Sequence, residues 1–132
     1  MNKHELINYW LDTSDRDYVT MHNLFKAGDH HWSLFIGHLV LEKLLKACYV
    51  KATGENAPRI HDLLRIAKAA QIKVSEKMAD SLDLITTFNI SARYPDFQQS
   101  FYKKCTHDFT AENISKIEEV RIWLKNVLQN LP

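Results

Sequence analysis

The stretch HLVLEKLLKA, residues 38–47, has the apolar content of a helix that is buried on several sides. It also carries four polar or charged side chains, His38, Glu42, Lys43 and Lys46. A helix that is apolar around most of its circumference normally packs between neighbours, where ionised groups are costly. These four residues therefore either form a stripe that meets solvent or line a functional site.

The chain around this stretch has the pattern of a helical protein. Apolar residues recur at steps of three and four, and no segment shows a sustained period of two. Gly28 and Gly54 suit the left-handed turns that end helices, and Pro58 and Pro95 prevent helices from continuing. The pattern predicts four long helices over about residues 6–27, 30–53, 76–92 and 111–128, a short helix near His61, and an aromatic connector over 96–109.

Amphipathic helices joined by short loops are not stable alone and pack side by side. We therefore predict an all-α fold, an antiparallel up-and-down four-helix bundle with one or two additional short helices. At 132 residues the chain is expected to form a single domain, residues 1–132.

The composition is that of an ordinary globular protein, with 45% hydrophobic and 25% charged residues. The net charge of +1 argues against bulk electrostatic adhesion to nucleic acid or to an anionic membrane. No apolar run is long enough to span a membrane, and the start lacks the apolar core of a signal peptide. Cys48 and Cys105 do not form a CxxC motif, so we expect reduced thiols and a cytoplasmic location.

Spacing places His38, Glu42 and Lys46 on one face of their helix. Glu42 followed by Lys46 is the favourable order for an intrahelical ion pair. One interpretation is a solvated stripe whose lysine stems cover apolar surface. The other is a ligand face, in which Lys43 and Lys46 attract a phosphate or another anion.

The segment RIHDL, residues 59–63, contains an adjacent histidine and aspartate. Such a pair occurs among the metal ligands of phosphohydrolases, but those enzymes need further ligands from other helices. The simpler interpretation is that His61 or Asp62 accepts hydrogen bonds from the first free N–H groups of the short helix. We expect the capping role, and no metal or cofactor.

The segment SARYPDF, residues 91–97, ends a helix at Pro95. Tyr94 is expected to be extended because it precedes a proline. Arg93 suits the negative end of the helix dipole and could pair with Asp96 across the turn. Alternatively, Arg93 is held there to bind an anion.

Three segments in this order, HLVLEKLLKA, PRIHDL and ARYPD, resemble the HEPN domain family, and the resemblance runs from about Leu6 to Leu128. It implies a helical bundle, commonly a homodimer, that is often found beside a nucleotidyltransferase or in toxin–antitoxin and antiviral systems. The residues that match the family pattern are Glu42, Lys43, Lys46, His61, Asp62, Arg93, Tyr94 and Asp96.

Members of the family bind nucleotides or cleave RNA without a metal. Cleavage is associated with an R-x4-6-H motif late in the domain. Here that spacing occurs only from Arg16 to His22, in the first helix, where six positions span about 600° and leave the two side chains on different faces.

We therefore expect a non-catalytic module that dimerises and binds a nucleotide or another phosphate-bearing ligand. A nucleotidyltransferase partner or a toxin–antitoxin system is the context that the resemblance suggests. The expected ligand-binding residues are Lys43, Lys46, His61, Arg93, Tyr94 and Asp96. The alternatives are an interaction scaffold or antitoxin partner without a ligand, and a ribonuclease toxin in which Arg93 acts with His61 or His107 on RNA.

Overall fold

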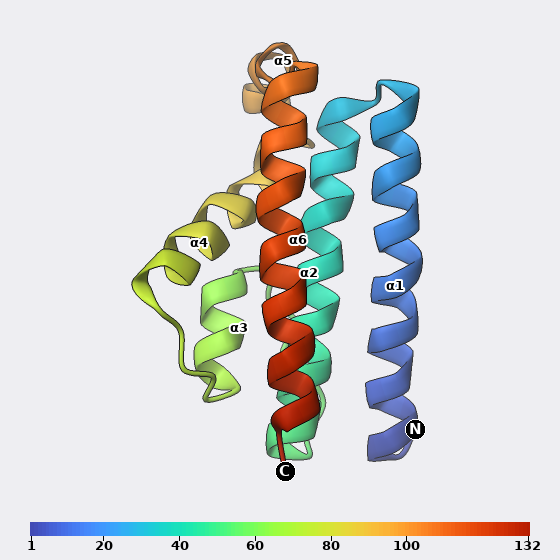
Figure 1. The fold of residues 1–132 in the computed structure, drawn as a ribbon, viewed down its shortest axis with the longest axis vertical. Helices are drawn as coiled ribbons and strands as arrows, with labels where there is room; N and C mark the ends of the chain where they lie inside the picture. Colours follow the sequence, from blue (N-terminus) through green and yellow to red (C-terminus); the bar gives the residue numbers. More distant parts are fainter.

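The computed structural model describes all 132 residues and is all-helical, as the sequence predicts. Four long helices run alternately up and down, and two short helices join them (Figure 1). The elements are α1 (Lys3–Ala27), α2 (His30–Thr53), α3 (Leu63–Ala69), α4 (Glu76–Ser91), α5 (Pro95–Lys104) and α6 (His107–Asn130).

The long helix α2 lies at the centre of the bundle. Helices α1 and α6 stand beside it, α3 and α4 cover its other side, and α5 closes one end (Figure 1). Both termini lie at the opposite end. The central position explains why α2 is apolar almost all round, since it contributes buried residues to every neighbour.

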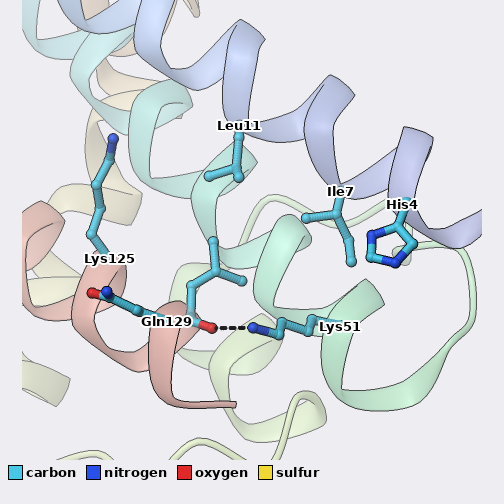
Figure 2. A pocket seen from close by; sticks show the side chains of 7 residues that line it. His4, Ile7, Leu11, Lys51, Lys125 and Gln129 are labelled. Carbon is cyan, nitrogen blue, oxygen red and sulfur yellow. Dashed lines mark hydrogen bonds between the residues drawn. The ribbon is translucent and has the colours of Figure 1, made fainter. Parts of the chain in front are cut away.

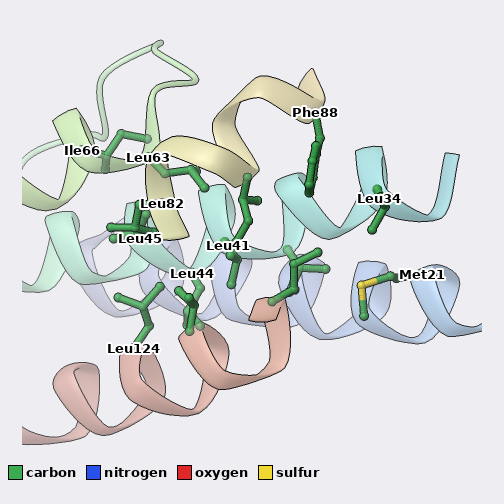
Figure 3. Packing of buried hydrophobic residues seen from close by; sticks show 14 of the residues in the cluster. Met21, Leu34, Leu41, Leu44, Leu45, Leu63, Ile66, Leu82, Phe88 and Leu124 are labelled. Carbon is green, nitrogen blue, oxygen red and sulfur yellow. The ribbon is translucent and has the colours of Figure 1, made fainter. Parts of the chain in front are cut away.

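The hydrophobic core extends along the whole of α2. Figure 3 shows it from Leu45, close to the α3 and α4 side, to Leu34 near Met21 of α1. Phe88 of α4 and Leu124 of α6 are completely or almost completely buried in the same cluster. One continuous core thus joins all four long helices.

Two small residues allow helices to approach α2 closely. Gly37 of α2 is buried, and a methyl group at this position would come within 2.5 Å of Ile117 Cδ1 and 3.0 Å of Met21 Sδ. On α1, the buried Ser14 hydroxyl donates a hydrogen bond to the Val40 carbonyl of α2, at 2.7 Å. Side chains of α1 and α6 therefore pack directly on the α2 backbone at Gly37.

Helix ends follow the sequence at most positions. Gly28 and Gly54 adopt the left-handed conformation, with φ of 83° and 75°, and end α1 and α2. The side chains of Asp62 and Ser75 accept hydrogen bonds at the N-termini of α3 and α4. The expected short helix, the capping role of Asp62 and the end of α2 are confirmed.

Residues 96–109, which the sequence pattern predicts to be a connector, contain most of the helix α5 and the start of α6. Pro95 ends no helix itself; it is the first residue of α5, where its missing N–H is not needed. The final helix begins at His107 rather than after Thr110, because Thr106 is its N-cap and accepts a hydrogen bond from the Phe109 N–H. The prediction of a connector over 96–109 and of a last helix that starts at about residue 111 was wrong.

Replacing Thr106 with alanine removes this cap, and we expect it to lower the free energy of unfolding by about 1 kcal/mol. Thr87→Ala is the matched control, since Thr87 lies exposed inside α4, where alanine is the better helix former. Urea denaturation of both variants measures the difference. Equal stability of the two variants would contradict the capping role.

Candidate functional site

The buried carboxylate of Glu42 joins two parts of the fold. Its side chain accepts a hydrogen bond from His61 Nδ1 at Oε1, 2.7 Å, and another from Lys46 Nζ at Oε2, 3.1 Å. Glu42 is 5% exposed and Lys46 is 6% exposed. The intrahelical ion pair expected from the sequence is present, but the stripe is buried and not solvated.

Lys46 is buried because two neighbouring elements cover this part of α2. Trp10 of α1 lies against it, with the ammonium 5.4 Å from the centre of the indole ring. The segment before α3 covers the adjacent Glu42 through His61. Contacts with a carboxylate and with an aromatic face together offset much of the free energy that a cation loses when it is removed from water.

His38 fixes the same segment through the main chain. Its Nε2 lies 2.9 Å from the carbonyl oxygen of His61. Since a carbonyl can only accept, Nε2 carries the proton, and Nδ1 is left buried without a partner. Burial lowers the pKa of His38 overall, although the hydrogen bond to the His61 carbonyl and the carboxylate of Glu42 act to raise it. The imidazole is therefore held neutral.

Arg93 occupies the junction between α4 and α5. Its Nε donates to the Asn89 carbonyl at 2.9 Å, and its Nη2 donates to Asn89 Oδ1 at 3.0 Å. The guanidinium lies over the rings of Phe35 and Tyr94, at 5.4 and 5.5 Å from their centres. The group is exposed yet fixed in orientation.

The pair between Arg93 and Asp96 that the sequence suggested is not formed. Asn89, one turn earlier on α4, presents two oxygens to the guanidinium instead. Asp96 is exposed in the first turn of α5, where its charge complements the helix dipole. Tyr94 is extended, with φ of −85° and ψ of 134°, as expected for a residue before proline.

The structure brings three segments of the sequence together around His38. His38 bonds to the His61 carbonyl, Arg93 lies over the ring of Phe35 three residues before His38 on α2, and Glu42 links His61 to Lys46. Lys43 is directed elsewhere, because its ammonium bonds to Asp17 of α1 at 2.6 Å. Of the expected ligand-binding residues, His61 and Arg93 thus present exposed basic groups beside one buried residue.

Comparison with known proteins identifies the family. The family model described as HEPN domain matches residues 7–127. This chain belongs to the HEPN family. A solved structure titled TT1696, from Thermus thermophilus, has a similar fold, with a TM-score of 0.80 and 19% sequence identity. The alignment covers 96% of this chain and 99% of that one. No curated protein matches the sequence.

Several contacts of this HEPN domain had no signal in the sequence. Trp10 over Lys46 and Phe35 under Arg93 join residues on different helices, which periodicity cannot pair. Asn89 is different, because it lies in the last turn of α4, four residues before Arg93, and this spacing is detectable in the sequence. His38 also has this spacing relative to Glu42.

The Arg16–His22 pair does not form a joint site in the HEPN fold. His22 Nε2 bonds to Glu118 of α6 at 2.8 Å, whereas Arg16 is exposed on α1. His107, the other histidine considered for RNA cleavage, packs against Phe25 at the start of α6. The hydrogen bonds of the Arg93 guanidinium go to Asn89 and to no histidine.

The placement of possible metal ligands and the burial of the two cysteines bear on metal binding and on thiol chemistry. The structure contains no group of three or more His, Cys, Asp or Glu side chains placed to hold a metal ion. Both cysteines are free, and burial raises the pKa of Cys48 to about 12 and that of Cys105 to about 11. Neither thiol is activated as a nucleophile. No helix combines the length and the apolarity needed to cross a bilayer.

Proposed function

We propose that this HEPN domain is a non-catalytic module of the cytoplasm that dimerises and binds a nucleotide or another phosphate-bearing ligand. The observation that supports the proposal most directly is that two exposed basic groups contact neighbouring positions of α2: the His61 main chain bonds to the buried His38, and Arg93 lies over Phe35. In this proposal the phosphate meets Arg93 and His61 first.

Arg93 has the geometry that phosphate recognition requires. Two of its N–H groups are used by Asn89, so three of the five donors of a guanidinium remain for a ligand. Because those two bonds and the Phe35 ring fix its plane, little side-chain entropy is lost when an anion binds. A bidentate contact with two phosphate oxygens follows naturally from this arrangement.

His61 and Tyr94 supply the complementary groups. The His61 side chain is 58% exposed and uses Nδ1 for Glu42, which leaves Nε2 free. Nε2 donates to a phosphate oxygen only when both ring nitrogens carry a proton. Tyr94 is 51% exposed and offers a ring face for a base. Lys43 and Lys46 are already paired with carboxylates, so in this proposal they support the site without adding net positive charge, and Asp96 borders the site.

Dimerisation is proposed through the exposed aromatic residues at the α5 end of the bundle. Trp32, Phe97 and Tyr102 are exposed there. Large apolar side chains that gather on a surface are typical of interaction sites. A nucleotidyltransferase or a toxin–antitoxin partner would be a further member of such an assembly.

The experiment is a thermal-shift series with nucleotides at millimolar concentration. A ligand present at 100 times its Kd adds about 2.7 kcal/mol of stability, which raises the Tm by several degrees. Arg93→Gln should weaken binding by about 10- to 100-fold, as expected for the loss of charge-assisted hydrogen bonds. Arg16→Gln, on the exposed face of α1, is the matched control and should leave the shift unchanged.

The absence of a shift with every nucleotide and with inorganic phosphate would refute the proposal. It would favour the second candidate, an interaction scaffold or antitoxin partner without a ligand. That candidate is supported by the internal pairing of Glu42, Lys43 and Lys46, which is what structural ion pairs require. For a scaffold, Arg93→Gln changes stability only.

A further inference from the structure

A separate pocket of about 380 Å³ opens between α1, the last turn of α2 and the last turns of α6 (Figure 2). Its volume falls within the range of small-molecule sites, about 300–1,000 Å³. It shares no residue with the His38 region. Three apolar side chains and three basic ones line most of it: Ile7, Leu11 and Leu128, and His4, Lys51 and Lys125.

The charged side of the pocket has an excess of positive charge. None of its lining residues is acidic. Lys51 Nζ donates to the Leu128 carbonyl at 2.8 Å, which is a neutral partner, and two of its three N–H groups remain free. Figure 2 shows this bond, with the lysine reaching across the pocket below Ile7 and Leu11.

Lys125 adds to this excess. Its partner Asp15 also accepts a hydrogen bond from Arg121, so one carboxylate faces two cations. Although burial acts to raise the pKa of Asp15, these two cations lower it overall, and the carboxylate stays ionised. The three groups together carry one net positive charge.

The remaining surface is apolar and held by the fold. Ile7 and Leu11 are one helical turn apart on α1 and point into the pocket (Figure 2), and both pack against the hydrophobic core. The lining contains no aromatic ring of Phe, Tyr or Trp on which a nucleobase could stack. An apolar floor with cations at its rim is complementary to a ligand that has one anionic head and an apolar body.

We propose that this pocket binds a small amphiphilic carboxylate, with its head at Lys51, within the positive field to which Lys125 contributes, and its chain against Ile7, Leu11 and Leu128. The ligand class is a medium-chain fatty acid. This site is independent of nucleotide binding, because the two sites lie on different surfaces of α2 and share no side chain.

Isothermal titration of the full chain with octanoate tests the proposal. We expect one octanoate bound per chain. Butyrate should bind more than tenfold more weakly, because each buried methylene is worth about fourfold in affinity. Octanol keeps the chain but lacks the charge, and it should also bind at least tenfold more weakly.

Three variants locate the binding. Lys51→Gln removes the charge while its amide can still donate toward Leu128, and it should weaken octanoate binding at least tenfold. Ile7→Trp fills the apolar part and should abolish binding. Lys77→Gln, at an exposed pair with Glu119, is the matched control and should bind as the wild type does.

Circular dichroism and the Tm establish whether each variant is folded. If Lys51→Gln is not folded, Lys125→Gln is used in its place. The proposal is overturned if octanoate does not bind at millimolar concentration. It is equally overturned if the folded charge and filling variants bind octanoate with unchanged affinity.

Discussion

Replacing Glu42 with alanine is expected to lower the free energy of unfolding by about 3–5 kcal/mol. The substitution leaves the ammonium of Lys46 buried without its carboxylate, and it removes the hydrogen bond that holds the His61 side chain on α2. Both effects act on the junction between α2 and the segment that leads into α3. Urea denaturation followed by circular dichroism measures the loss.

A double variant separates the charge from the packing. In Glu42→Leu/Lys46→Met both partners become apolar and no unpaired charge remains, so we expect most of the stability to return. Glu119→Ala removes the carboxylate of an exposed ion pair with Lys77 and should cost at most about 1 kcal/mol. If Glu42→Ala costs no more than Glu119→Ala, the structural role assigned to Glu42 is wrong.

Gly37→Leu is expected to destabilise the bundle by about 3 kcal/mol, the upper part of the usual range for overpacking. The new side chain has no space, because even its first carbon would approach Ile117 Cδ1 to 2.5 Å. Either α6 or α1 must move away from α2. Thermal and urea denaturation report the loss.

The matched control is Gly37→Ala. Its single methyl group meets the flexible end of the Ile117 side chain, and alanine improves helix propensity by about 1 kcal/mol, so these effects oppose each other. We expect a net change within about 1 kcal/mol. Similar stabilities of the alanine and leucine variants would show that the three helices are not closely packed at this point.

The fold could be predicted because its signals are local. Gly28 and Gly54 end helices through their own backbone conformation. Asp62 and Ser75 cap helices by accepting a hydrogen bond from the N–H group three residues further along the chain. The sequence pattern does not predict α5, because proline occurs both after the end of a helix and at its first position. Pro95 follows a helical segment, which indicates a helix end, but it occupies the first position of α5.

The candidate site could be predicted only in part. Glu42 and Lys46 are four residues apart, so their ion pair follows from helix geometry. Their burial does not, because it depends on Trp10 and His61, which reach them from other elements. The same limit applies to Lys43, whose partner Asp17 lies on α1.

The two buried thiols have a practical consequence for measuring motion in this domain. With pKa values of about 12 and 11, Cys48 and Cys105 remain protonated at neutral pH. A cysteine introduced at an exposed position will react with a maleimide dye far faster than either of them. Fluorophores placed on α3 and α5 can thus report the distance across the His61–Arg93 surface in the otherwise native sequence.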